Sequence, residues 1–159
     1  MKNVILIFLC ILSIIFFSRV LPHLPNFTPV ISLAIYSSFF LKRLGMISFL
    51  ISYLFVDMYL GLNSILIWTW GSFLIILYLS NFIKNINHRI LAIFSMPTIF
   101  FLITNFGVWT TGYYDLTFQG LLKCYTMALP FYANTLVSTA FFSLLIEFII
   151  LFKKRIFQT

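Results

Sequence analysis

Long apolar runs, separated by short polar or proline-containing stretches, make up most of the chain. The runs that could form helices lie at 4–20, 29–41, 46–60, 65–83, 90–106 and 131–152. A helix needs about 20 mostly apolar residues to cross the hydrocarbon core of a bilayer, and several of these runs approach or reach that length. The pattern therefore predicts an all-α polytopic membrane protein with six transmembrane helices.

Helix-breaking and polar residues mark the expected boundaries between these helices. Pro22, Pro25 and Pro29 predict an extended connection after the first helix, because proline lacks the amide donor that a helix needs. The polar run 84–89 predicts a loop between the fourth and fifth helices. Pro97 lies inside the fifth helix, where neighbouring helices in a membrane can tolerate a kink.

The stretch 103–131 differs from the rest of the chain, because it mixes aromatic residues with polar ones. It contains Trp109, Tyr113, Tyr114, Tyr125, Asn105, Asp115, Lys123 and Pro130. A helix in hydrocarbon needs none of these side chains. We therefore expect an external aromatic cap loop, with a short interfacial helix at about 121–129.

Composition restricts the class of protein further. Hydrophobic residues make up 62% of the 159 residues and charged residues 8%, which excludes a soluble globule. The ten bases are too few and too scattered for a nucleic-acid-binding surface. We expect a single transmembrane domain, residues 1–159, whose surroundings are the lipid bilayer.

The bases also predict an orientation, because cytoplasmic loops are enriched in Lys and Arg. If the N-terminus is inside, only Arg19 and Lys123 lie on the outer face. The inner face then holds Lys2, Lys42, Arg43, Lys84, Arg89, Lys153, Lys154 and Arg155. Both termini are therefore expected in the cytoplasm.

Three polar residues are expected near the outer ends of the third, fifth and sixth helices: Asp57, Asn105 and Asn134. An acid at the centre of a membrane helix costs about 2.5–3.5 kcal/mol on insertion scales, and less near an interface. Two interpretations stay open: these groups bind a ligand in a pocket roofed by residues 109–129, or they only form hydrogen bonds between helices.

Four further residues complete the candidate ligand site: Arg19, Asn26, Trp109 and Tyr113. The two aromatic residues have a second interpretation as part of a membrane-edge aromatic belt. His23 has no further metal ligands near it in the chain, so we expect neither a metal site nor a cofactor.

Two other features have simple interpretations. Glu147 and Lys154 lie two turns apart on one helix face, which predicts a partly paired acid near the inner end of the last helix. Ala34 and Ser38 form a small face on the second helix that permits close approach of another helix, either in this chain or in a partner. Paired intramembrane Asp residues, a Ser with a His, and a zinc-binding helix motif are not evident, so we expect no enzymatic activity.

Several segments resemble an uncharacterised family of bacterial putative transport proteins: NFTPVISLAIYS (26–37), the helix bearing Asp57, TNFGVW (104–109) and GLLKCYTMALPF (120–131). The six-helix plan with an outer cap is also similar to the S components of energy-coupling-factor vitamin transporters. These resemblances imply a multi-pass protein of the bacterial cytoplasmic membrane that binds a small, vitamin-like molecule in its outer half. They also imply a possible energising membrane subunit, for which the Ala34/Ser38 face is the candidate contact.

A second function remains open. The protein is also similar in size and helix count to rod-shape proteins, which are scaffold subunits of a cell-envelope assembly. In that case the polar residues of the outer leaflet would only hold helices together.

Overall fold

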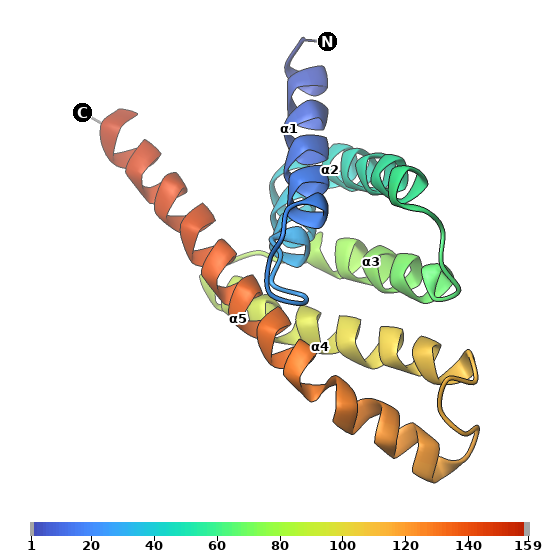
Figure 1. Cartoon of the computed structure of the whole chain (residues 1–159). Helices are drawn as coiled ribbons and strands as arrows, with labels where there is room; N and C mark the ends of the chain where they lie inside the picture. The colour runs from blue at the N-terminus through green and yellow to red at the C-terminus, as the bar shows by residue number, and fades with distance from the viewer. Residues whose placement is uncertain (1, 158–159) are drawn as a thin grey trace.

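The structure, a computed structural model, is built entirely of helices within the residues that it describes, which are 2–157 for the backbone and 4–152 for the side chains. Figure 1 shows the five helices in chain order. They are α1 (Lys2–Val20), α2 (Val30–Leu60), α3 (Leu66–Ser80), α4 (Ile86–Thr110) and α5 (Phe118–Phe157). The predicted all-α class is confirmed.

Three of these helices are long and apolar enough to cross a membrane: Val30–Leu60, Ile86–Thr110 and Phe118–Phe152. α1 and α3 contribute shorter apolar helices, Val4–Val20 and Leu66–Ser80. Large apolar side chains are exposed on the helix surfaces, for example Leu6, Phe55 and Leu144. A surface of this kind is stable against lipid and not against water, so the chain is a membrane protein. Length and composition do not support the six separate spans that the sequence predicted.

The expected second and third helices form one element, α2, which is interrupted at a single residue. The backbone of Lys42 leaves the helical region, with φ 51° and ψ −131°. Next to this break, a Cβ atom on Gly45 would lie only 1.9 Å from the backbone oxygen of Ser37. Glycine is needed at this position because the chain folds back closely on itself. Ile31 and Asp57, from opposite ends of α2, border the same cavity, so residues 30–41 and 43–60 lie side by side.

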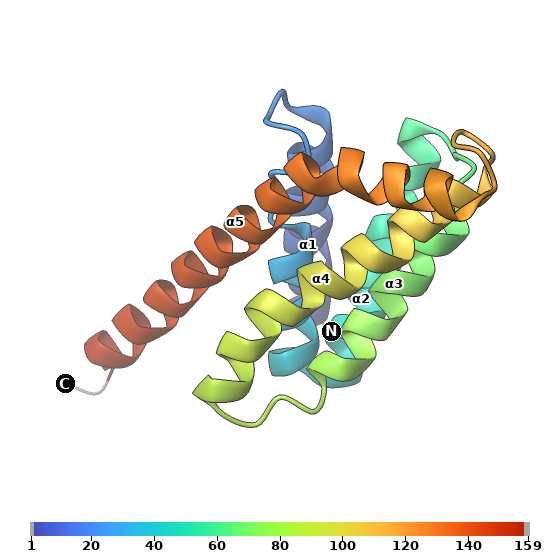
Figure 2. The ribbon, with the colours of Figure 1, turned by 90° about the horizontal axis from the view of Figure 1, so that it is seen from below.

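The predicted external cap is much smaller in the structure. α4 continues to Thr110 and α5 begins at Phe118, which leaves only residues 111–117 as a connection. The short interfacial helix expected at 121–129 is not a separate element, because it belongs to α5, which continues through Pro130. Figure 2 shows that α5 bends along its length and that its C-terminal end extends beyond the other helices.

The polar run 84–89 is a loop only at its beginning. α4 starts at Ile86, and the Asn85 side chain caps it by accepting a hydrogen bond of 3.0 Å from the backbone N–H of His88. This cap satisfies one of the amide donors that a helix leaves unpaired at its start. Pro97 lies inside α4, as the sequence predicted.

The interior contains small hydroxyl side chains beside the large apolar ones. Phe49, Phe73 and Leu77 are fully buried, and so are several serines. Ala34 and Ser38 are also fully buried, and the Ser38 hydroxyl donates a hydrogen bond of 2.6 Å to the carbonyl of Leu77 in α3. The small face of α2 therefore has its partner within this chain. It is not accessible to an energising subunit, because small residues here let α3 approach.

Candidate functional site

A cavity of about 350 Å³ opens at the end of the molecule where α1 ends, α2 both begins and ends, and α3 begins. Five helices and two connections contribute to its walls. The lining residues are Arg19, His23, Asn26, Thr28, Val30, Ile31, Tyr53, Asp57, Leu60, Asn63, Ile65, Leu66, Thr69, Phe73, Phe100 and Thr135. Charged and amide groups thus meet an apolar wall in one space.

An ion pair between α1 and α2 forms the charged part of this cavity. Arg19 donates from Nη1 to Oδ1 of Asp57, whose other oxygen, Oδ2, accepts a hydrogen bond of 2.9 Å from the indole Nε1 of Trp70. Asp57 is only 3% exposed. Two charge-assisted hydrogen bonds offset the large cost of removing this carboxylate from water. The guanidinium of Arg19 also lies over the ring of Tyr53, at 4.8 Å from the ring centre.

The connection between α1 and α2 contributes the polar side chains on another side of the cavity. His23, Asn26 and Thr28 all come from this short segment. Asn26 has a φ of 60°, a left-handed conformation that asparagine tolerates better than most residues. The segment is fixed to α5, because the side-chain Nδ2 of Asn134 donates to the carbonyl of Pro25 at 2.9 Å.

This connection lines the cavity, whereas the roof that the sequence predicted does not. We expected residues 109–129 to cover the pocket, but the lining of the cavity includes none of them. The physical reason is that α4 and α5 continue as helices through most of that stretch, so that it packs as a helical pair. Figure 2 shows α4 and the first half of α5 side by side.

A second hollow of about 200 Å³ adjoins the first. Asn26, Ile65, Thr69, Phe100 and Thr135 line both spaces. Asn105 lines only the second one, and its Nδ2 donates a hydrogen bond of 2.8 Å to the carbonyl of Phe101, one turn earlier in α4. Its side-chain oxygen has no hydrogen-bond partner among the described residues.

The structure brings together some of the predicted site residues and separates others. Arg19, Asn26 and Asp57 line the first cavity, and Asn105 lines the adjoining hollow.

Asn134, Trp109 and Tyr113 line neither space. Asn134 instead holds the connection between α1 and α2 through Pro25. Trp109 donates from Nε1 to the carbonyl of Asp115 at 3.0 Å, and Tyr113 is 80% exposed. The structure therefore does not bring these three residues to the same space as the others, and their assignment to a ligand site stays a prediction.

Tyr53, Trp70 and Thr69 are among the residues of the site that the sequence analysis did not predict. Tyr53 lies one helical turn before Asp57 on the same face, a spacing that could have identified it. Trp70 could have been identified because an indole N–H needs a partner when it is buried, and here it donates to Asp57. Thr69, which lines both spaces, carries no signal in the sequence.

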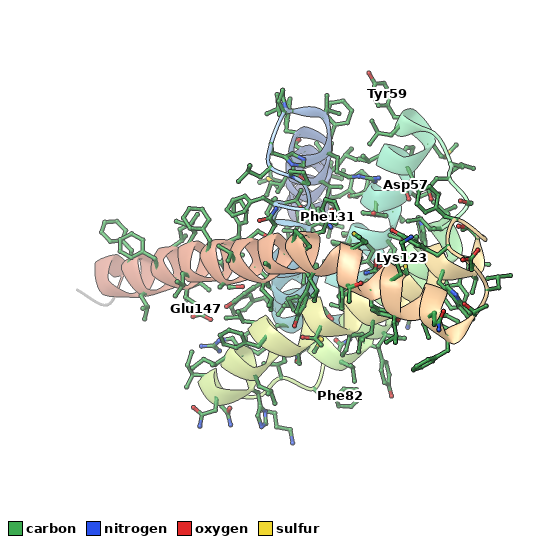
Figure 3. All side chains as sticks on the ribbon, turned by 60° about the horizontal axis from the view of Figure 1, so that its bottom comes forward. Asp57, Tyr59, Phe82, Lys123, Phe131 and Glu147 are labelled. Atoms are coloured by element: carbon green, nitrogen blue, oxygen red, sulfur yellow. The ribbon has the colours of Figure 1, made fainter. Side chains whose placement is uncertain are left out.

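Glu147 forms a second ion pair, in a different part of the molecule. Its Oε1 lies 2.6 Å from Nε of Arg89 in α4 and accepts a hydrogen bond of 2.8 Å from the hydroxyl of Tyr36 in α2. Figure 3 shows that Glu147, on the C-terminal half of α5, is well separated from Asp57. The side chain of Lys154, the partner expected from sequence, lies outside the described residues.

No group of three or more His, Cys, Asp or Glu side chains within the described part of the chain could hold a metal ion. The chemistry available to the cavity is therefore the hydrogen bonding and charge of Arg19, Asp57 and the amide and hydroxyl groups, together with the apolar contact of its wall.

Comparison with known proteins gives a family but no function. No curated protein and no solved structure matches the chain significantly. One family model matches residues 1–158, which is almost the whole chain, and its description is "Family of unknown function (DUF6580)". The chain therefore belongs to the family DUF6580.

Proposed function

We propose that this protein is a non-enzymatic membrane transport protein, or the substrate-binding component of one, that takes up a small vitamin-like molecule. The cavity of about 350 Å³ carries this proposal. Sites for small molecules typically measure about 300–1,000 Å³ and combine apolar walls with a few well-placed polar groups. Here Phe73 and Phe100 belong to the apolar wall, and the Arg19–Asp57 pair provides the polar groups.

The proposed location is the bacterial cytoplasmic membrane, with both termini in the cytoplasm. Eight of the ten bases then lie on the inner side. We further propose that α2 crosses the membrane twice, because its two ends border one cavity and its backbone folds back at Lys42. The five helices would then make six crossings, and the cavity would face the outside.

Four of the candidate ligand residues remain in this proposal because they line the two spaces: Arg19, Asn26, Asp57 and Asn105. Asn134 acts indirectly, by holding the segment that supplies Asn26. An energising membrane subunit would dock on the lipid-facing surface, because the Ala34/Ser38 face is buried.

The test compares two threonine variants of the full-length protein. Thr69→Phe places a ring in both hollows, whereas Thr126→Phe adds the same ring at an exposed position on α5 that lines neither. Each protein is purified from bacterial cells in mild detergent, and small molecules retained by it are identified by mass spectrometry. We expect one molecule to be enriched in the wild type and in Thr126→Phe, and to be lost from a monodisperse Thr69→Phe. Equal amounts of every molecule in all three samples would contradict the proposal.

A scaffold subunit of a cell-envelope assembly is the second candidate. It is favoured by the observation that Asn105 and Asn134 both donate their hydrogen bonds within the protein. Under this function, replacing either residue by Leu would lower thermal stability, by about 0.6 kcal/mol per hydrogen bond. No retained molecule would depend on Thr69, and the protein would instead co-purify with defined envelope components.

A further inference from the structure

Arg19 and Asp57 differ in how many hydrogen-bonding groups they leave free for a ligand in the cavity. Both oxygens of Asp57 already have partners, Arg19 and Trp70, and its side chain is only 4% exposed. Arg19 uses a single N–H group on Asp57, and its side chain is 23% exposed. A guanidinium carries five N–H donors, so most donors of Arg19 have no partner among the described residues.

The surroundings of Arg19 fix the plane of these donors. The Tyr53 ring lies beneath the guanidinium. Tyr53 also lines the cavity, and its hydroxyl has no hydrogen-bond partner among the described residues. A guanidinium whose one edge is held by a carboxylate offers its other edge as a planar fork, and this fork matches the two oxygens of a second carboxylate.

The hydrogen-bonding groups of the cavity favour an anion over a cation. A cation would have no acceptor comparable to Asp57, whose oxygens are occupied by Arg19 and Trp70. Phe73 and Phe100 provide aromatic surface for an apolar ring.

We propose that the cavity selects small ring carboxylates, with the carboxylate on the free edge of Arg19 and the ring against Phe73 and Phe100. This inference rests on the proposed small-molecule function and adds the chemical class of the ligand. Asp57 then contacts Arg19 and not the ligand, which differs from the role that the sequence suggested for it.

The experiment measures binding of matched acids and amides to the full-length protein in lipid nanodiscs. The probes are 2-naphthoate with 2-naphthamide, and indole-3-acetate with indole-3-acetamide. We expect each carboxylate to bind about 10- to 100-fold more tightly than its amide, since a hydrogen bond to a charged group contributes that much.

Three variants connect this preference to Arg19. Arg19→Gln alone would leave Asp57 without its counter-charge, so the double variant Arg19→Gln/Asp57→Asn removes both charges and avoids an unpaired buried acid. It should bind acid and amide within about twofold of each other. Arg19→Lys keeps the charge without the fork and should show an intermediate preference. Arg43→Gln removes an exposed arginine outside the cavity and should keep the wild-type preference.

Three results would overturn the inference: equal binding of acids and amides by the wild type, a full preference in the double variant, or no binding of any carboxylate. None of these alone would refute the proposed function. A neutral or cationic molecule retained in the Thr69-dependent manner described above would leave that function standing and reject only the carboxylate class.

Discussion

Individual residues determine how closely α3 and α4 approach. A Cβ atom on Gly107 of α4 would lie 2.4 Å from Cδ1 and Cγ of Trp68 in α3, and 2.7 Å from its Cβ. The Trp68 ring also packs edge-on against Phe106, with ring centres 5.2 Å apart. The ring is thus held on two sides, so it has little freedom to move away from an added methyl group.

We therefore predict that Gly107→Ala destabilises the protein by about 1–3 kcal/mol, the usual cost of overpacking an interior. Thermal unfolding in detergent measures the effect. Gly71→Ala in α3 is the matched control, because a Cβ there meets nothing within 4 Å. It should leave stability unchanged or raise it slightly, since alanine favours helix more than glycine does. An equal loss in both variants would show that the contact with Trp68 is not the cause.

Pairs of helices are held by polar contacts that the apolar pattern does not show. The Glu147–Arg89 pair joins α5 to α4, and the hydroxyl of Tyr36 adds α2 to the same cluster. The Arg89 guanidinium also lies over the ring of Phe39, at 5.2 Å from the ring centre. Removing one charge from such a partly buried pair leaves the other without compensation.

Glu147→Gln should accordingly destabilise the protein by about 3–5 kcal/mol. The double variant Arg89→Gln/Glu147→Gln should recover part of this loss, because it leaves no unpaired charge. Lys123→Gln, which removes an exposed base on α5, should have no effect on the unfolding temperature. If the double variant were as unstable as the sum of its single variants, the two side chains would not be coupled.

The connection between α1 and α2 depends on α5 for its position. Asn134 and Ser138 donate hydrogen bonds to the carbonyls of Pro25 and Asn26, at 2.9 and 3.4 Å. Phe27 in the same segment packs against Phe142 of α5, with ring centres 5.9 Å apart. These contacts hold Asn26 beside both hollows.

We predict that Asn134→Leu makes this connection open more often, so that amide hydrogen exchange at residues 23–29 becomes faster. Hydrogen exchange followed by mass spectrometry measures the change. Asn105→Leu is the control, because Asn105 donates only to Phe101 in its own helix. Exchange that stays at the wild-type rate in Asn134→Leu would mean that the contact of Phe27 is sufficient to hold the segment.

For the molecule as a whole, the distribution of bases makes the proposed topology testable. Reporter fusions after Arg43, Arg89 and Arg155 should be cytoplasmic, and fusions near Asn63 and Gly112 should be external. Arg43 directly follows the break in α2, so its fusion decides whether α2 crosses the membrane twice. An external reading after Arg43, with an external reading near Asn63, would reject the double crossing.

The sequence by itself determined the helical class and the membrane character of this protein. Both follow from local properties, namely the length of the apolar runs and the positions of Pro, Gly and polar residues between them. Local properties also identified Asp57 as a residue that needs a partner. An acid among apolar neighbours costs free energy in a membrane whatever the tertiary arrangement of the helices. Local properties do not show where a helix ends when the helix continues through a proline, as α5 does at Pro130.

Only the tertiary structure decided which groups meet. Arg19 pairs with Asp57 across 38 positions of sequence, and Tyr36 reaches Glu147 across 111. Part of the cavity lining likewise comes from a proline-containing connection held by Asn134, and none of it comes from residues 109–129. Contacts of this range depend on how α2 folds back at Lys42 and on where α5 packs, and no local pattern of residues encodes that geometry.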